Sequence, residues 1–168
     1  MDDEYGIIIY STIQYPRKMQ SRFAHKIYPH DNSILMAEDN PDDVIITKRA
    51  WKKGQIQNPL HIVNNGEEAI EFLHKKGSYT DAPTPSLILL DLKMPRMDGF
   101  EVLSILKGDN QFRTIPIIVL TTSDRDIDIK RAYRLGCNSY ICKPVNFEKF
   151  KKVLMEIQQY WLILCKIP

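Results

Sequence analysis

The chain has 168 residues, of which 43% are hydrophobic and 26% charged, with a formal net charge of +2. This length is typical of one domain, and the apolar content suffices for a packed core, which argues against a wholly disordered chain. The near balance of charge gives no overall reason to expect nucleic acid or a membrane surface as the partner.

The chain shows no sign of export or membrane insertion. Its longest N-terminal apolar run, Ile7–Ile9, follows acidic residues, whereas a signal peptide has a basic start and a longer apolar core. The C-terminal run 160–165 is far shorter than the roughly 20 apolar residues of a membrane span. The three cysteines lack Cys-x-x-Cys spacing and are expected to be reduced, and no two of the four histidines show zinc-ligand spacing. We therefore expect a soluble, cytoplasmic protein.

Residues 1–32 differ from the rest of the chain. They show no sustained periodicity and contain scattered basic residues together with Pro16 and Pro29. This pattern predicts a disordered tail or an extension upstream of the true start, with Met19 as one candidate initiator. A docking arm is the alternative.

From Ser33 onward, strands and helices are predicted to alternate. Asn40 is suited to cap a helix and Pro41 to occupy its first position, while the acids Asp42–Asp43 are interpreted only as favourable charges at the helix start. The elements predicted in this half are a strand at 34–37, a helix from 40 to its C′ residue Gly54, a strand at 60–63 and a helix at 67–76 closed by Gly77.

The second half repeats the alternation. The run Leu87–Leu90 is continuously apolar, as in a strand buried on both faces of a parallel sheet. The elements predicted after it are a helix at 100–107, a strand at 115–120, a helix at 124–135, a strand at 139–142 and a helix from Asn146 to about Leu164. Five strands alternating with five helices indicate right-handed crossovers and a parallel sheet covered on both faces, in one α/β domain over residues 33–168.

Four of the five predicted strands end on chemically reactive residues, and in such sheets functional groups gather at the carboxyl ends of the strands. The residues are Glu38 and Asp39 after the first strand, Asp91 after the third, Thr121 after the fourth and Lys143 after the fifth.

Three converging carboxylates need a counter-charge. At about 4 Å each pair repels by roughly 4 kcal/mol with an effective dielectric constant of about 20. Lys143 supplies one positive charge, and Mg²⁺, which prefers a few carboxylates plus waters and phosphate oxygens, supplies the rest. We expect Asp39 to ligate Mg²⁺ directly and Glu38 directly or through water, with the main-chain carbonyl of Lys93 as a further ligand.

The same residue types predict phosphoryl transfer. Asp91 is the predicted nucleophile, because a carboxylate can attack a phosphoryl donor to give an aspartyl phosphate. The hydroxyl of Thr121 is predicted to donate to one phosphoryl oxygen, and Lys143 to pair with another. Catalysis then consists of positioning and charge neutralisation.

In these motifs the chain resembles the bacterial response-regulator receiver domains over about residues 34–152. The resemblance rests on the acidic pair Glu38-Asp39, on the segment 91–99 (DLKMPRMDG), and on Thr121 and Lys143-Pro144, which lie 30 and 52 residues after Asp91. The narrower motifs EDNP, PRMDG and LTTS and the ending WLILCKIP resemble the single-domain regulators paired with bacterial phytochrome-type histidine kinases.

The resemblance implies a flavodoxin-like (βα)5 doubly wound fold with strand order 2-1-3-4-5. It also implies a phosphoacceptor switch rather than an enzyme, served by a sensor histidine kinase and signalling by protein contact or onward phosphotransfer. Tyr140 matches the aromatic that turns inward when Thr121 moves toward the phosphoryl group, and the Lys143–Pro144 bond is usually cis in this family.

Three residues depart from the family pattern without removing a required group. Glu38 stands where Asp is common, Thr122 where Ala or Gly is common, and Lys93 at a position that tunes dephosphorylation. Lys93 also argues against a phosphohydrolase of the haloacid dehalogenase type. Such enzymes have an Asp-x-Asp motif at the nucleophile, and Lys93 stands where the second Asp would be. A flavodoxin-like nucleotide-binding module is disfavoured, because the acidic turn 38–41 lacks the glycines of a phosphate loop.

The last helix carries two sets of apolar residues. One face suffices to cover the sheet, so the second set suggests a partner surface. This pattern predicts a two-fold homodimer through the last helix and the edge of the fifth strand, against the alternative that the tail folds back on its own domain. The first set is Phe147, Phe150, Leu154, Ile157, Trp161 and Leu164, and the second is Val153, Tyr160 and Ile163.

Overall fold

The computed structural model describes residues 32–164, without the side chains of residues 163 and 164, so the prediction for the N-terminal segment 1–32 lies outside the described residues except at Asn32. Five parallel strands form one sheet in the order β2-β1-β3-β4-β5, which confirms the predicted order. Along the chain they are β1 Ile34–Ala37, β2 Leu60–Val63, β3 Leu87–Leu90, β4 Ile117–Thr121 and β5 Ser139–Cys142.

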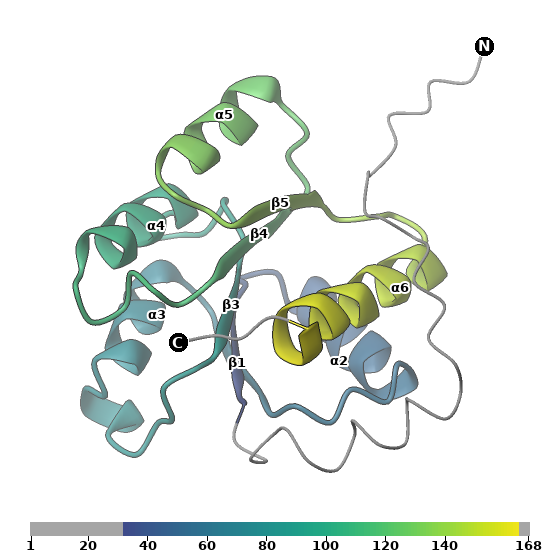
Figure 1. The fold of residues 1–168 in the computed structure, drawn as a ribbon, viewed down its shortest axis with the longest axis horizontal. Helices are drawn as coiled ribbons and strands as arrows, with labels where there is room; N and C mark the ends of the chain where they lie inside the picture. The colour runs from purple at the N-terminus through teal and green to yellow at the C-terminus, as the bar shows by residue number, and fades with distance from the viewer. Residues whose placement is uncertain (1–31, 165–168) are drawn as a thin grey trace. The chain divides into compact units, whose positions relative to one another are not determined.

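Five α-helices cover the two faces of the sheet. Figure 1 shows α2 and α6 together on one face and α3, α4 and α5 on the other, in agreement with the two groups of buried residues. None of the helices within residues 32–164 is long and apolar enough to cross a membrane. The helices are α2 Pro41–Lys53, α3 Gly66–Leu73, α4 Gly99–Gly108, α5 Asp126–Arg134 and α6 Phe147–Ile157, with a 3₁₀-helix at Gly77–Tyr79 and a π-helix at Gln158–Leu164.

The central strands are apolar throughout because both of their faces are covered. In β1, Leu35 and Ala37 pack with the α3–α5 layer, while Ile34 and Met36 pack with the α2–α6 layer. All four are buried, as is every residue of β3. Burial on both sides removes the alternation of polar and apolar residues that a half-exposed strand shows.

Two predicted boundaries shift for identifiable reasons. The helix predicted at 67–76 spans Gly66–Leu73, because Lys75 takes a left-handed backbone, with φ of 55°, that an α-helix does not continue. The strand predicted at 115–120 spans Ile117–Thr121, since Pro116 has no N–H to donate to the ladder.

Two further differences concern caps. Gly54 closes α2 as its C-cap with a right-handed φ of −75°, and the left-handed residue is Gln55, not the predicted glycine. The helix predicted at 124–135 begins only at Asp126, after Arg125 as its N-cap. Gly77 and Gly136 have left-handed backbones, with φ of 57° and 94°.

The last helix does not continue as an α-helix to Leu164. It is α-helical to Ile157 and then π-helical, so the next buried apolar residue is Leu162, five residues on. Leu162 is 3% exposed and Trp161 packs partly against the same group of core residues. Val153, counted as surplus from the sequence, is also buried in this core, where α6 packs beside α2 on the same face of the sheet.

Candidate functional site

Backbone hydrogen bonds bring four strand ends to one edge of the sheet. The Asp91 N–H donates to the Ala37 carbonyl at 3.0 Å, so Asp91 lies beside Glu38, the residue that follows Ala37. The Lys143 N–H donates to the Thr121 carbonyl at 2.7 Å. Because the strands are parallel and in register, the residues after β1, β3, β4 and β5 meet where the strand order reverses, which is the usual position of sites in such folds.

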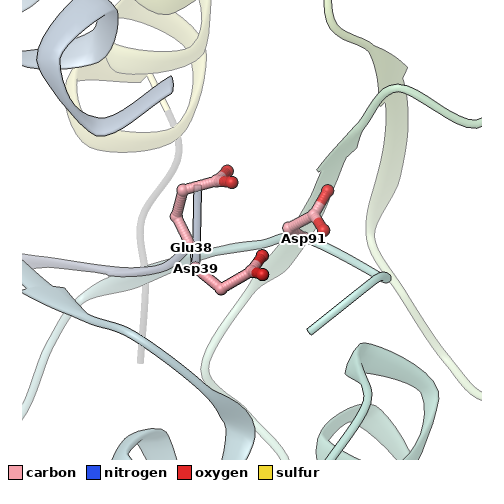
Figure 2. Close-up of side chains that lie close together, drawn as sticks. All are labelled: Glu38, Asp39 and Asp91. Atoms are coloured by element: carbon pink, nitrogen blue, oxygen red, sulfur yellow. The ribbon is translucent and has the colours of Figure 1, made fainter. Parts of the chain in front are cut away.

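Glu38, Asp39 and Asp91 form an acidic group at this edge. Figure 2 shows the three carboxylates around one space, and each offers an oxygen within 4.8 Å of the others. Glu38 and Asp91 are buried, whereas Asp39 is exposed and opens the site to solvent. This donor set of carboxylate oxygens suits a hard divalent cation.

Lys143 is the buried cation of the site. Its Nζ lies 2.5 Å from Glu38 Oε2, 2.7 Å from Asp43 Oδ2 and 3.5 Å from Asp91 Oδ1, and its side chain is 9% exposed. The contact with Asp43 corrects the interpretation of that residue as a helix-start charge only. Asp43 does lie in the first turn of α2, but its carboxylate also reaches across to the residue after β5.

Burial controls the charges of this site. Burial raises the pKa of Glu38 to about 7, while Lys143 lowers it and Asp91 raises it. Burial alone would lower the pKa of Lys143, but its hydrogen bonds to Asp43 and Glu38 and the charge of Asp91 raise it above the usual value. The lysine is therefore a fixed positive charge among carboxylates that outnumber it.

The loop after β3 holds Asp91 from its main chain. The Lys93 N–H donates to Asp91 Oδ2 at 2.8 Å, and the Gly99 N–H donates to the Leu92 carbonyl at 3.0 Å, which closes the loop. Arg96 lies within it at a left-handed φ of 66°. Asp98 caps α4 through a reciprocal capping box with Glu101. The metal-binding role of the Lys93 carbonyl stays a prediction.

Thr121 and Tyr140 are linked through the loop after β4. Thr121 is fully buried and its Oγ1 accepts from the Ser123 N–H at 3.5 Å. The Tyr140 hydroxyl donates to the Ser123 carbonyl at 2.9 Å. Burial raises the pKa of Tyr140 to about 12, so its hydroxyl keeps its proton at neutral pH. The two residues are thus bridged by Ser123, and their switching role stays a prediction.

Sequence reasoning missed a polar cluster in this loop. Asp128 on α5 accepts from Ser123 Oγ at 2.6 Å and from both Nε and Nη2 of Arg125, at 2.9 and 3.1 Å. The hydrogen bond from Ser123, followed by those from Arg125, holds the pKa of Asp128 below its usual value. The spacing of Arg125 and Asp128 by three residues was the available signal, since such residues meet on a helix.

The cis Lys143–Pro144 bond that the family resemblance implies is wrong. No peptide bond among residues 32–164 is cis, so the Lys143–Pro144 bond is trans. The trans form is favoured by about 0.5–1 kcal/mol for a bond before proline. The ammonium of Lys143 reaches the acidic group from this backbone.

The chain matches known proteins over the region that carries this site. A model of the response regulator receiver domain matches residues 34–155. The probable methanogenesis regulatory protein FilR2 of Methanothrix harundinacea is 39% identical over 131 residues, 77% of this chain and 83% of that protein. Response regulator Rcp1 of Synechocystis is 36% identical over 135 residues, 80% of this chain and 92% of that protein.

Solved structures agree with the observed fold. The phosphorylated cyanobacterial phytochrome response regulator RcpA has a TM-score of 0.77 at 35% identity, covering 82% of this chain and 99% of its own. The Mn²⁺-bound form of response regulator Rcp1 has a TM-score of 0.75 at 36% identity, over 82% and 99% of the two chains. The family model matches most of this chain. The chain therefore belongs to the response regulator receiver domain family, whose members work in phosphorelay signalling.

Proposed function

We propose that the chain accepts a phosphoryl group on Asp91 from a sensor histidine kinase, in a reaction that needs Mg²⁺. The main support for this proposal is the position of the Asp91 carboxylate. It lies beside the acidic partners Glu38 and Asp39, and the Lys143 ammonium is 3.5 Å from Asp91 Oδ1. A carboxylate next to both a cation site and a fixed ammonium is suited to attack an anionic donor, because both neighbours neutralise the incoming charge.

The residues fit the divalent ion that this reaction requires. Glu38, Asp39 and Asp91 would hold it, and the ion would supply the positive charge that the site lacks with Lys143 alone. Asp39 is exposed, which leaves room for the waters that Mg²⁺ retains. The structural relative Rcp1 has been solved in a Mn²⁺-bound form, which supports a divalent metal here as part of the proposal.

The protein groups then have separate tasks. An Asp91 oxygen forms the new P–O bond while the P–N bond of the donor phosphohistidine breaks, and the imidazole leaves with the bonding electrons. Lys143 neutralises one phosphoryl oxygen and the Thr121 hydroxyl donates to another. Tyr140 changes position when Thr121 moves, because both residues are hydrogen-bonded to Ser123. Signalling follows by protein contact or onward phosphotransfer.

We propose a phytochrome-type kinase as the partner because two structural relatives, RcpA and AtBRR, are phytochrome and bacteriophytochrome response regulators. Exposed apolar residues close in sequence to Asp43 and Lys143 support a protein donor. Ile45 and Ile46 on α2 and Val145 after β5 are exposed, and the contact between Asp43 and Lys143 joins their two segments. Exposed apolar side chains beside a reactive group favour a docked protein over a free small substrate.

The phosphohydrolase alternative has no support from the site. Its general acid would stand two residues after the nucleophile, where the chain has Lys93, whose N–H instead binds the Asp91 carboxylate. We therefore propose a phosphoacceptor switch whose only catalysis is its own phosphorylation and dephosphorylation. Within the described residues, Cys137 and Cys142 are free thiols, which supports a place in the reducing cytoplasm.

Asp39→Ala is expected to weaken Mg²⁺ binding by about tenfold or more, since a carboxylate next to a cation contributes well over the 1.4 kcal/mol that corresponds to a factor of ten. Isothermal titration of the unphosphorylated protein measures this. Asp39→Ala should also lose phosphorylation by acetyl phosphate, because the reaction needs Mg²⁺. Asp81→Ala, which removes an exposed acid from the loop before β3, is the control. Equal Mg²⁺ affinity in Asp39→Ala and the parent would show that Asp39 is not a ligand.

We also propose a two-fold homodimer through the last helix and the β5 edge, tightened by phosphorylation. Its support is the exposure of Met155 and Tyr160, at 41% and 52%, although Val153, Trp161 and Leu162 cover their own domain. Tyr160→Glu is expected to shift the protein to monomer in sedimentation equilibrium, with and without a phosphoryl mimic. Ile105→Glu, at a position on α4 that is 41% exposed, should leave the dimer intact. A parent that stays monomeric at high micromolar concentration in both states contradicts the proposal.

A further inference from the structure

The Lys143 ammonium has three N–H groups and three neighbouring carboxylates. Glu38 and Asp43 accept hydrogen bonds at 2.5 and 2.7 Å, while Asp91 lies 3.5 Å away, beyond an ordinary hydrogen bond. Two of the three N–H groups are thus fixed by close partners. The third is left for the side of the site that holds Asp91.

Glu38 serves two neighbours at once. Its carboxylate belongs to the acidic group that can hold a metal ion, and the same carboxylate binds Lys143. Asp43 is not in that group, so its hold on Lys143 does not compete with a cation. When a metal ion binds the Glu38 carboxylate, the Asp43 carboxylate still holds the Lys143 ammonium.

The position of Asp43 is well defined by the start of α2. Asn40 caps this helix by accepting from the Asp42 N–H at 2.9 Å, and its carbonyl accepts from the Val44 N–H at 3.1 Å. Asp43 lies between Asp42 and Val44, whose N–H groups are both held by Asn40, and its side chain is 26% exposed. Asp42, next to it, is exposed and has no ion-pair partner within 4 Å in the described part of the chain.

We propose that Asp43 is a positioning residue for the phosphorylation of Asp91: it holds the Lys143 ammonium in the site and directs its remaining N–H toward Asp91. The inference rests on the proposed function. Without Asp43, the four-carbon stem of Lys143 is fixed only by Glu38, which is shared with the cation, so the ammonium is less often in place when the donor arrives. Misplacement of a charge-neutralising group slows the transfer step.

The test compares phosphorylation rates for the full chain with a small donor, phosphoramidate, followed by intact mass. Asp43→Ala is expected to react about tenfold more slowly than the parent, the factor that corresponds to loss of one charge-assisted hydrogen bond. Asp43→Asn keeps an oxygen acceptor and is expected to recover a part of the rate. Asp42→Ala removes the same charge from the same helical turn and should react as the parent does.

Two further readouts separate positioning from a general effect on the site. The affinity for Mg²⁺ in Asp43→Ala is expected to stay close to that of Asp42→Ala. In NMR spectra of lysine ammonium groups, Asp43→Ala should shift the Lys143 Nζ signal, and Asp42→Ala should leave it in place. Either result would overturn the inference: equal rates in Asp43→Ala and Asp42→Ala, or a loss of Mg²⁺ affinity in Asp43→Ala as large as the loss of rate. A parent that takes up no phosphoryl group contradicts the proposed function instead.

Discussion

Asp91→Asn is expected to abolish phosphoryl incorporation. The amide has almost the volume of the carboxylate, so the variant should fold, but it lacks the negative oxygen that attacks phosphorus. Incubation with acetyl phosphate and Mg²⁺, followed by intact mass, measures the adduct directly. The parent should gain one phosphoryl group and the variant none.

The same substitution removes charge repulsion. Asp91 is buried beside Glu38, and two carboxylates about 4 Å apart repel by roughly 4 kcal/mol at an effective dielectric constant of about 20. Without metal, Asp91→Asn should therefore be at least as stable to urea as the parent. Asp98→Asn is the control, because Asn serves equally well as the N-cap of α4. Acid-labile phosphate that persists on Asp91→Asn at full stoichiometry would rule out Asp91 as the acceptor.

Gly99→Ala is expected to have the largest effect on stability. A Cβ on Gly99 would lie 2.2 Å from the Asp91 carbonyl oxygen and 2.8 Å from the Leu92 Cα, both main-chain atoms. Relief requires α4 or the loop after β3 to move, and the hydrogen bond from the Gly99 N–H to Leu92 to break. We expect the free energy of unfolding to fall by about 3 kcal/mol, and phosphorylation to slow because the main chain of Asp91 shifts.

Gly108→Ala is the matched control at the other end of α4. A Cβ there meets nothing within 4 Å. Alanine is favoured over glycine in a helix by about 0.5–1 kcal/mol, so this variant should be equal to the parent or slightly more stable. Urea unfolding of both variants gives the comparison. Equal midpoints for Gly99→Ala and the parent would show that Gly99 does not constrain the loop.

The sequence predicts the layered fold well because its strongest signals are local. The apolar runs of β1 and β3 indicate strands buried on both faces, and both are buried. Their last residues, Ala37 and Leu90, lie side by side in the sheet. That pairing is why Glu38 and Asp91 meet, and it follows once a parallel sheet with β1 beside β3 is recognised.

Contacts between distant segments could not be predicted in the same way. Asp43 is indistinguishable in sequence from Asp42, since both are acids in the first turn of a helix, and only the packing of α2 near Lys143 separates them. The last helix shows a regular apolar spacing, but the spacing does not reveal where the domain surface ends. The π-helical segment instead places Leu162 in the core.

Locating the phosphoryl group in the parent protein tests directly whether Asp91 is the acceptor. After reaction with acetyl phosphate and Mg²⁺, borohydride reduces an aspartyl phosphate to homoserine, which peptide mass mapping identifies at a single position. We expect homoserine at position 91 alone, formed with Mg²⁺ and not with a chelator. Homoserine at position 39 or at another acid, or equal labelling with and without the metal, would contradict Mg²⁺-dependent phosphorylation of Asp91.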